Sequence, residues 1–205
     1  MSFYDYFQIS AAIAFLLILV GRALHMILNR KINPIAIGGG KRGFRLAFEL
    51  ISFSGLVVWV VETFLYALHS NVRLFPWPLD VQLIDSEPAR IAGVVLITLG
   101  LIIFVLAFVS FGDSWRVGFD VKTPGALVTT GLFAFTRNPI YVFLDLWFLG
   151  TFLINGRLIF LIFVLLAFAV IHWQILQEED FLRKLFGQKY EEYLKKTGRY
   201  VTLPR

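Results

Sequence analysis

Five long apolar stretches, separated by polar segments, dominate the pattern along the chain. They cover residues 6–28, 46–68, 91–111, 139–154 and 158–176. Each approaches the ~20 apolar residues that an α-helix needs to cross a bilayer, where the backbone must satisfy its own hydrogen bonds. The pattern therefore predicts an all-α integral membrane protein with about five transmembrane helices. The fourth stretch is the shortest, so we expect it to tilt or to stop short of one surface.

Only three residues, Asn155, Gly156 and Arg157, join the last two apolar stretches. Two helices with so short a connection must fold back on each other, so the sequence predicts a tight helical hairpin. Beyond residue 176, apolar and aromatic residues recur at helical spacing. We expect this tail to form a pair of amphipathic helices that lie against the membrane.

Basic residues are distributed unequally between the polar segments. Of the 19 Lys and Arg residues, only Arg73, Arg90 and Arg157 fall on the side of the membrane that holds the N-terminus. The positive-inside rule therefore predicts an N-terminus outside and a C-terminal tail in the cytoplasm, in a bacterial inner membrane or a membrane of the endoplasmic-reticulum type. Acidic Asp5, before the first apolar stretch, favours an uncleaved membrane anchor over a signal peptide.

Composition narrows the possible functions. Hydrophobic residues make up 58% of the chain and charged residues 16%, against ~45–50% and ~25% in soluble domains. A water-soluble globule is therefore excluded. The formal charge of +5 does not indicate a nucleic-acid partner, because the basic residues follow the membrane topology. The chain has no Cys and three His, so we expect no metal site.

Polar residues at the start of the fourth apolar stretch are the first candidates for a site. Asn138 before Pro139 predicts the N-cap and first residue of a helix. That helix N-terminus, with Arg137 beside it, can bind a carboxylate or phosphate; alternatively, it is only a capped helix whose arginine reaches lipid headgroups. The acidic run at 178–180, directly after the fifth stretch, either binds a cation or is a solvated face.

Ionisable residues also occur inside the apolar stretches, at Glu49, Glu62, Asp145 and His172. Such residues are costly in a bilayer and are candidates for function by default. Asp145 lies four residues after Tyr141, hence on the same helix face. For His172 we expect a structural hydrogen bond between helices. The roles of all four residues stay open.

Five short motifs follow one another in the C-terminal half. They are Gly-Asp-Ser-Trp-Arg at 112–116, Leu-Val-Thr-Thr-Gly at 127–131, Arg-Asn-Pro-Ile-Tyr at 137–141, Glu-Glu at 178 and 179, and Phe-Gly-Gln-Lys-Tyr-Glu-Glu-Tyr at 186–193. In this order, with a tight hairpin before the last two, the segment resembles the isoprenylcysteine carboxyl methyltransferase family and its phospholipid methyltransferase-like relatives. The resemblance implies one integrated domain with a three-span membrane region, 1–111, and a catalytic region, 112–205.

The resemblance also implies an S-adenosylmethionine-dependent methyltransferase, most simply an O-methyltransferase of the isoprenylcysteine type. Its acceptor is lipophilic and enters from the bilayer, so membrane lipids are its other partners. The family's cofactor-binding positions correspond to Trp115, Leu127, Val128, Gly131, Arg137, Asn138, Pro139, Tyr141, Glu178 and Glu179.

Three of these residues, Arg137, Tyr141 and Glu179, are expected to be catalytic. We expect Glu178 or Glu179 to bind the cofactor's α-ammonium group, and Arg137 with the helix N-terminus to bind its carboxylate. Tyr141 with Trp115 would shape the channel for methyl transfer. Many family members have His where this chain has Asn138, and an amide cannot accept a proton as a general base.

Two other functions fit parts of the pattern. Membrane sterol reductases, which use NADPH, also carry an Arg-x-Pro-x-Tyr turn and paired acids in the tail, but they are longer. A non-enzymatic scaffold or transporter subunit would use the polar residues only to join helices. Within the methyltransferase interpretation, the acceptor can be an isoprenylcysteine carboxylate, a phospholipid amine, or a small thiol or other lipophile.

Overall fold

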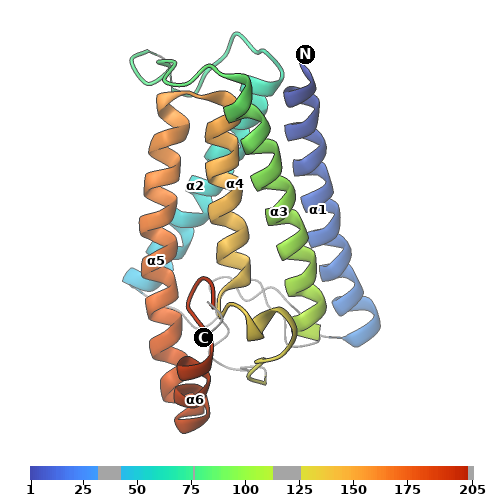
Figure 1. The fold of residues 1–205 in the computed structure, drawn as a ribbon, viewed down its shortest axis with the longest axis vertical. Coiled ribbons are helices and arrows are strands. Elements are labelled where there is room, and N and C mark those ends of the chain that lie inside the picture. Colours follow the sequence, from blue (N-terminus) through green and yellow to red (C-terminus); the bar gives the residue numbers. More distant parts are fainter. Residues whose placement is uncertain (32–42, 76, 113–125, 203–205) are drawn as a thin grey trace. The chain divides into compact units, whose positions relative to one another are not determined.

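The computed structural model describes residues 1–31, 43–75, 77–112 and 126–202. Its elements are α1 (Phe3–Arg30), α2 (Phe44–Ala67), α3 (Glu87–Phe111), the 3-10 helix η2 (Gly131–Ala134), α4 (Pro139–Asn155), α5 (Leu158–Phe186) and α6 (Gln188–Lys196) (Figure 1). Strand pairing in the described residues is limited to one isolated bridge, between Gln82 and Arg157. The predicted all-α class is confirmed.

All five predicted apolar stretches form helices. Four of them are long and apolar enough to cross a membrane: Phe3–Asn29 in α1, Leu46–Ala67 in α2, and α3 and α5 over their full lengths. The remaining helix, α4, is apolar but has only 17 residues, so the expectation of a short fourth helix is confirmed. How many of the five helices cross the bilayer completely stays a prediction.

Internal contacts divide the chain into two compact units. The first contains residues 1–73 and 111–126, and the second contains residues 74–110 and 127–205. Within the first unit, α1 contacts α2. Asp5 Oδ2 lies 2.8 Å from His69 Nε2, which fastens the start of α1 to the residues that follow α2. The second unit contains most of α3 and all of η2, α4, α5 and α6.

The turn between α4 and α5 requires a glycine. Gly156 follows the last residue of α4 at a φ of 63°, and a Cβ there would lie 1.8 Å from the carbonyl oxygen of Ile84. The segment before α3 braces this turn, because the Leu83 and Ile84 N–H groups donate to the Gly156 carbonyl at 2.7 and 3.0 Å. The predicted hairpin is confirmed, and α4 and α5 run side by side in opposite directions (Figure 1).

Glycines bring α3 and α4 close together. A Cβ on Gly93 would lie 2.6 Å from the Gly150 carbonyl oxygen, and a Cβ on Gly150 would lie 2.7 Å from the Gly93 carbonyl oxygen. Further along, the rings of Phe104 and Phe143 stack with centroids 4.6 Å apart. Small residues at such a crossing are typical of membrane helices, whose association depends on close van der Waals contact. This packing fixes α4, whose first turn carries several predicted site residues.

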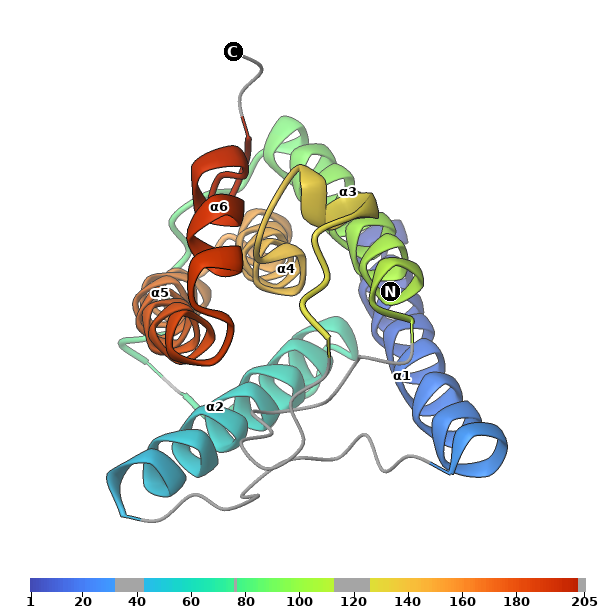
Figure 2. The same ribbon diagram turned by 90° about the horizontal axis from the view of Figure 1, so that it is seen from below.

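The end of α5 differs from the prediction. The helix does not stop near residue 176 but continues to Phe186, so the expected first helix of the tail is an extension of α5. The second expected tail helix exists as α6, with Tyr190 and Tyr193 buried. Gly187, at a φ of 53°, separates the two helices. Figure 2 shows α6 and the segment 127–138 next to the N-terminal end of α4.

Candidate functional site

The first turn of α4 is held by the C-terminal tail. Asn138 is at the N-cap position and Pro139 is the first helical residue, both as predicted. The Asn138 side chain makes no capping hydrogen bond to this helix. Its Nδ2 instead donates to the carbonyl oxygen of Arg199 at 3.0 Å, and the Thr136 hydroxyl donates to the same oxygen at 3.3 Å. The Asn138 amide thus joins the start of α4 to the tail.

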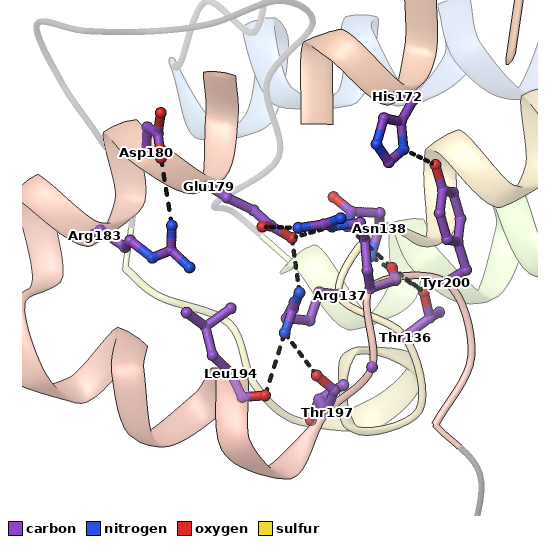
Figure 3. Close-up of polar contacts among 12 residues, drawn as sticks. Thr136, Arg137, Asn138, His172, Glu179, Asp180, Arg183, Leu194, Thr197 and Tyr200 are labelled. Carbon is purple, nitrogen blue, oxygen red and sulfur yellow. Dashed lines mark hydrogen bonds and ion pairs between the residues drawn. The ribbon is translucent and has the colours of Figure 1, made fainter. Parts of the chain in front are cut away.

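Two arginines enclose one buried carboxylate at this place (Figure 3). Arg137 Nη2 donates to Glu179 Oε1 at 2.8 Å. Arg199 binds the same carboxylate through two donors, Nε to Oε1 at 3.0 Å and Nη2 to Oε2 at 2.8 Å. The Glu179 side chain is 3% exposed. We call Arg137, Glu179 and Arg199 the charged triad; it joins the start of α4, the end of α5 and the tail.

Arg137 is also bound to the backbone of the tail. Its Nη1 donates to the carbonyl oxygens of Thr197 at 2.9 Å and Leu194 at 3.3 Å, and its main-chain N–H donates to Gly198 O at 3.1 Å. The side chain is 9% exposed. Its Nε is buried and has no hydrogen-bond partner among the described residues. The sequence predicted that Arg137 binds a ligand, whereas in the structure most of its N–H groups donate to other groups of the protein.

Residues 197–202 form a strap over residues 133–138. Besides the bonds to Thr136, Arg137 and Asn138, the Thr202 N–H donates to Phe135 O at 2.7 Å. Just before the strap, the Tyr193 hydroxyl donates to Phe133 O at 2.6 Å. These bonds join two segments that are about sixty residues apart in the sequence, and they close the cluster on the side of α6.

Tyr141 and Glu178 form a second link between α4 and α5. The Tyr141 hydroxyl donates to Glu178 Oε2 at 3.0 Å. Tyr141 is one helical turn along from Arg137, and Glu178 is the neighbour of Glu179. The structure therefore brings the Arg-Asn-Pro-Ile-Tyr motif and the paired acids into direct contact.

A third polar group lies further along the same two helices. His172 Nδ1 is 2.8 Å from the Tyr200 hydroxyl (Figure 3), so its partner is in the strap and not, as expected, on another helix. Asp145 Oδ1 is buried and has no hydrogen-bond partner among the described residues. Burial raises the pKa of the Tyr200 phenol, and the Asp145 carboxylate raises it further. The position of Asp145 above the motif at residues 137–141 stays a prediction.

The electrostatics of the tail follow from burial and pairing. The hydrogen bonds to Glu179 raise the pKa of the Arg199 guanidinium. Burial raises the pKa of the Tyr190 and Tyr193 phenols, so both hydroxyls stay protonated and can donate. In the part of the chain that the structure describes, His, Asp and Glu residues form no group of three that could hold a metal ion.

The motif at residues 127–131 leads into η2. Leu127 and Val128 are half-buried, and Gly131 has a φ of 63°. A Cβ on Gly131 would lie 2.5 Å from Ser110 Oγ, and this oxygen accepts a hydrogen bond from the Leu132 N–H at 3.0 Å. Gly131 thus lets the segment pass close to the end of α3. Trp115, the other aromatic residue predicted at the site, lies outside the described residues.

Known proteins share this arrangement of sequence. The phospholipid methyltransferase family matches residues 88–189, which include Arg137, α4, α5 and Glu179. The chain is similar to the protein-S-isoprenylcysteine O-methyltransferase of Schizosaccharomyces pombe, with 39% identity over 38% of this chain and 33% of the relative. It is also similar to that of Saccharomyces cerevisiae, with 28% identity over 68% of this chain and 56% of the relative. These matches confirm the predicted resemblance to the isoprenylcysteine carboxyl methyltransferase family.

The fold agrees with this resemblance. The solved structure of a eukaryotic intramembrane Ras methyltransferase, isoprenylcysteine carboxyl methyltransferase, matches with a TM-score of 0.55 at 19% identity, over 88% of this chain and 60% of that one. The chain spans a third to just over half of the length of its curated relatives. The integral membrane fold expected from the sequence is confirmed.

The sequence analysis did not identify three residues that contribute to this cluster: Arg199, Tyr200 and Tyr193. Arg199 is one of several basic residues in the tail, and its spacing does not distinguish it from the others. Gly198 was the only local signal, since it ends the helical pattern; a Cβ there would lie 2.2 Å from Val201 O, so the strap turns tightly at this point.

Proposed function

We propose that this integral membrane protein is an S-adenosylmethionine-dependent methyltransferase whose acceptor is lipophilic, such as an isoprenylcysteine carboxylate. The names of its relatives support the activity. The observation that carries the proposal is the meeting of two predicted cofactor-binding segments, through Arg137 with Glu179 and Tyr141 with Glu178. Both segments can then contact one small molecule.

The residues present fit the amino-acid end of such a cofactor. An α-amino acid group carries an ammonium and a carboxylate, and it requires acidic and basic partners close together. Glu178 and Glu179 are the acidic candidates for the ammonium, and Arg137 holds Glu179 in position from the opposite side. The N-terminus of α4, at Asn138 and Pro139, favours a carboxylate through the helix dipole and its first-turn amides.

The remaining predicted residues would line the rest of the cofactor site. Leu127, Val128 and Gly131 offer a largely apolar segment beside α4, suited to the nucleoside. Tyr141 and Trp115 would shape the channel in which the acceptor meets the methyl group, because aromatic faces stabilise a sulfonium through cation–π contact.

The chemistry requires alignment more than acid–base catalysis. Bound S-adenosylmethionine supplies an electrophilic methyl group whose sulfur loses its positive charge as the acceptor attacks. The protein's part is to align the two reactants and to exclude water. A carboxylate acceptor is already deprotonated, so Asn138 in place of a basic residue does not obstruct this reaction.

We also propose the orientation in the membrane. The N-terminus would lie outside, and the start of α4, the end of α5 and α6 would lie in the cytoplasm, where the cofactor is available. The basic residues of α6 and the strap support this orientation through the positive-inside rule. The acceptor would then enter from the bilayer into the catalytic region, residues 112–205.

The test is methyl transfer by the purified full chain in lipid. Labelled S-adenosylmethionine is offered with matched farnesyl thiols, carboxylates and amines, and S-adenosylhomocysteine binding is measured by calorimetry. We expect binding and transfer to at least one acceptor class. Glu179→Gln and Arg137→Ala should each weaken binding, whereas Asp180→Asn, at an exposed neighbouring acid, should not.

Unchanged affinity in both Glu179→Gln and Arg137→Ala would remove the site assignment. A thermal shift with NADPH and none with S-adenosylmethionine would refute the methyltransferase and support the sterol-reductase-like enzyme instead. Failure to bind either cofactor would support a scaffold or transporter subunit.

A further inference from the structure

The charged triad contains a surplus of positive charge. Two guanidinium groups, of Arg137 and Arg199, share the single carboxylate of Glu179. Charges this close are expensive to bury unless each has a partner of opposite sign. Binding of an additional anion next to the triad is therefore favoured. Binding of an additional cation is favoured only if an anion binds with it.

The two arginines differ in how strongly they are committed to the protein. Arg137 is 9% exposed and binds two backbone carbonyls besides Glu179. The Arg199 side chain is 32% exposed. Among the described residues, its guanidinium donates only to Glu179, through Nε and Nη2. Arg199 is thus the arginine that can change partners without breaking other contacts of its side chain.

The backbone of Arg199 is fixed independently of this ion pair. Its carbonyl oxygen accepts hydrogen bonds from Asn138 Nδ2 and the Thr136 hydroxyl. The next residue, Tyr200, is held by His172. The strap can therefore stay in place while the Arg199 side chain, which has several rotatable bonds, turns away from Glu179.

We infer that Arg199 is a ligand for the carboxylate of the cofactor's amino-acid group, and that it exchanges Glu179 for this carboxylate when the cofactor binds. The inference rests on the proposed function. The ammonium group takes the place of the Arg199 guanidinium on Glu179, and Arg199 pairs with the carboxylate. Positive and negative groups then alternate from Arg137 through Glu179, ammonium and carboxylate to Arg199, so every charge has an opposite neighbour.

The test separates the carboxylate from the rest of the ligand. S-adenosylhomocysteine is compared with its decarboxylated analogue, 5′-deoxy-5′-(3-aminopropylthio)adenosine, which keeps the ammonium and the nucleoside. Binding of both to the full chain in lipid nanodiscs is measured by calorimetry. The variant is Arg199→Gln, and the matched control is Arg183→Gln, because Arg183 also pairs with acids of α5 and α6 but is 45% exposed.

We expect Arg199→Gln to weaken S-adenosylhomocysteine binding about tenfold or more, as for loss of a charge-assisted hydrogen-bonded pair. The decarboxylated analogue should bind the variant as well as the wild type, or more tightly, because its ammonium no longer competes with Arg199 for Glu179. Arg183→Gln should leave both affinities unchanged.

Equal weakening of both ligands in Arg199→Gln would overturn the inference, since that result indicates a purely structural role. Unchanged binding of S-adenosylhomocysteine would overturn it as well. If Arg199→Gln does not fold, Arg199→Lys replaces it. The ratio of the affinity for S-adenosylhomocysteine to the affinity for the decarboxylated analogue should then be smaller in the variant than in the wild type. An unchanged ratio refutes the partner exchange. If the wild type binds neither ligand, the proposed function itself fails.

Discussion

Glu179→Gln should destabilise the protein severely, because it removes the only negative charge of the triad. The substitution keeps the size of the side chain but leaves two guanidinium groups beside a neutral amide. In the wild type, Glu179 accepts bonds at 2.8, 3.0 and 2.8 Å and is 3% exposed. Removal of one partner from a buried pair costs about 3–5 kcal/mol. Asp180→Asn removes an exposed charge whose pair with Arg183 spans 3.4 Å, and should cost under about 1 kcal/mol.

The assay is thermal unfolding of both variants in the same detergent, followed by tryptophan fluorescence. At roughly 2–4 °C per kcal/mol for a chain of this size, Glu179→Gln should melt about 10 °C below the wild type, and Asp180→Asn within about 3 °C of it. Limited trypsin digestion provides a second measurement, since release of the strap should unfold the end of α6 and make the bonds after the exposed Lys195 and Lys196 cleavable. If Glu179→Gln melts like Asp180→Asn and resists trypsin equally, the triad does not hold the tail.

Three further predictions concern packing and the turn, each measured as a change in melting temperature. Gly150→Ala should cost about 1–3 kcal/mol, because its Cβ would lie 2.7 Å from a carbonyl oxygen of α3, whereas Gly55→Ala, with nothing within 4 Å, should be neutral or stabilising; equal effects would contradict the close crossing. Gly156→Ala should destabilise the protein, because a φ of 63° costs a residue with a Cβ about 1–2 kcal/mol and that Cβ would also lie 1.8 Å from a carbonyl oxygen; a melting temperature equal to that of the wild type would contradict the tight turn. Tyr193→Phe removes a buried hydrogen bond of 2.6 Å and should cost about 1–2 kcal/mol; a melting temperature equal to that of the wild type would show that this bond does not hold the tail.

Local rules were enough to predict the helices and the hairpin. A run of apolar residues in a bilayer becomes a helix because a helix satisfies its own backbone, whatever surrounds it. Pro139 and Asn138 marked the start of α4 because a proline lacks the N–H that a first helical residue does not need. Asn155, Gly156 and Arg157 marked the turn because three residues leave no other path.

Local rules failed where the tail returns to the helices. The pattern ended the fifth helix near residue 176 because charged residues begin there, yet α5 continues to Phe186, since Glu, Lys and Arg are good helix formers outside the bilayer. The Asn138 side chain joins the start of α4 to the strap through the Arg199 carbonyl, and no residue near it in the sequence indicates this contact.

The sequence alone determined that this is a helical membrane protein with a tight hairpin, because these properties depend on neighbours along the chain. It also showed residues suited to cofactor binding before and after the hairpin. Only the tertiary structure decided that Arg137, Glu179 and Arg199 share one buried cluster, and that Tyr200 meets His172. The pairing of charges depends on which segments fold back to the same place. The sequence around an arginine in a basic tail does not indicate which carboxylate it will pair with.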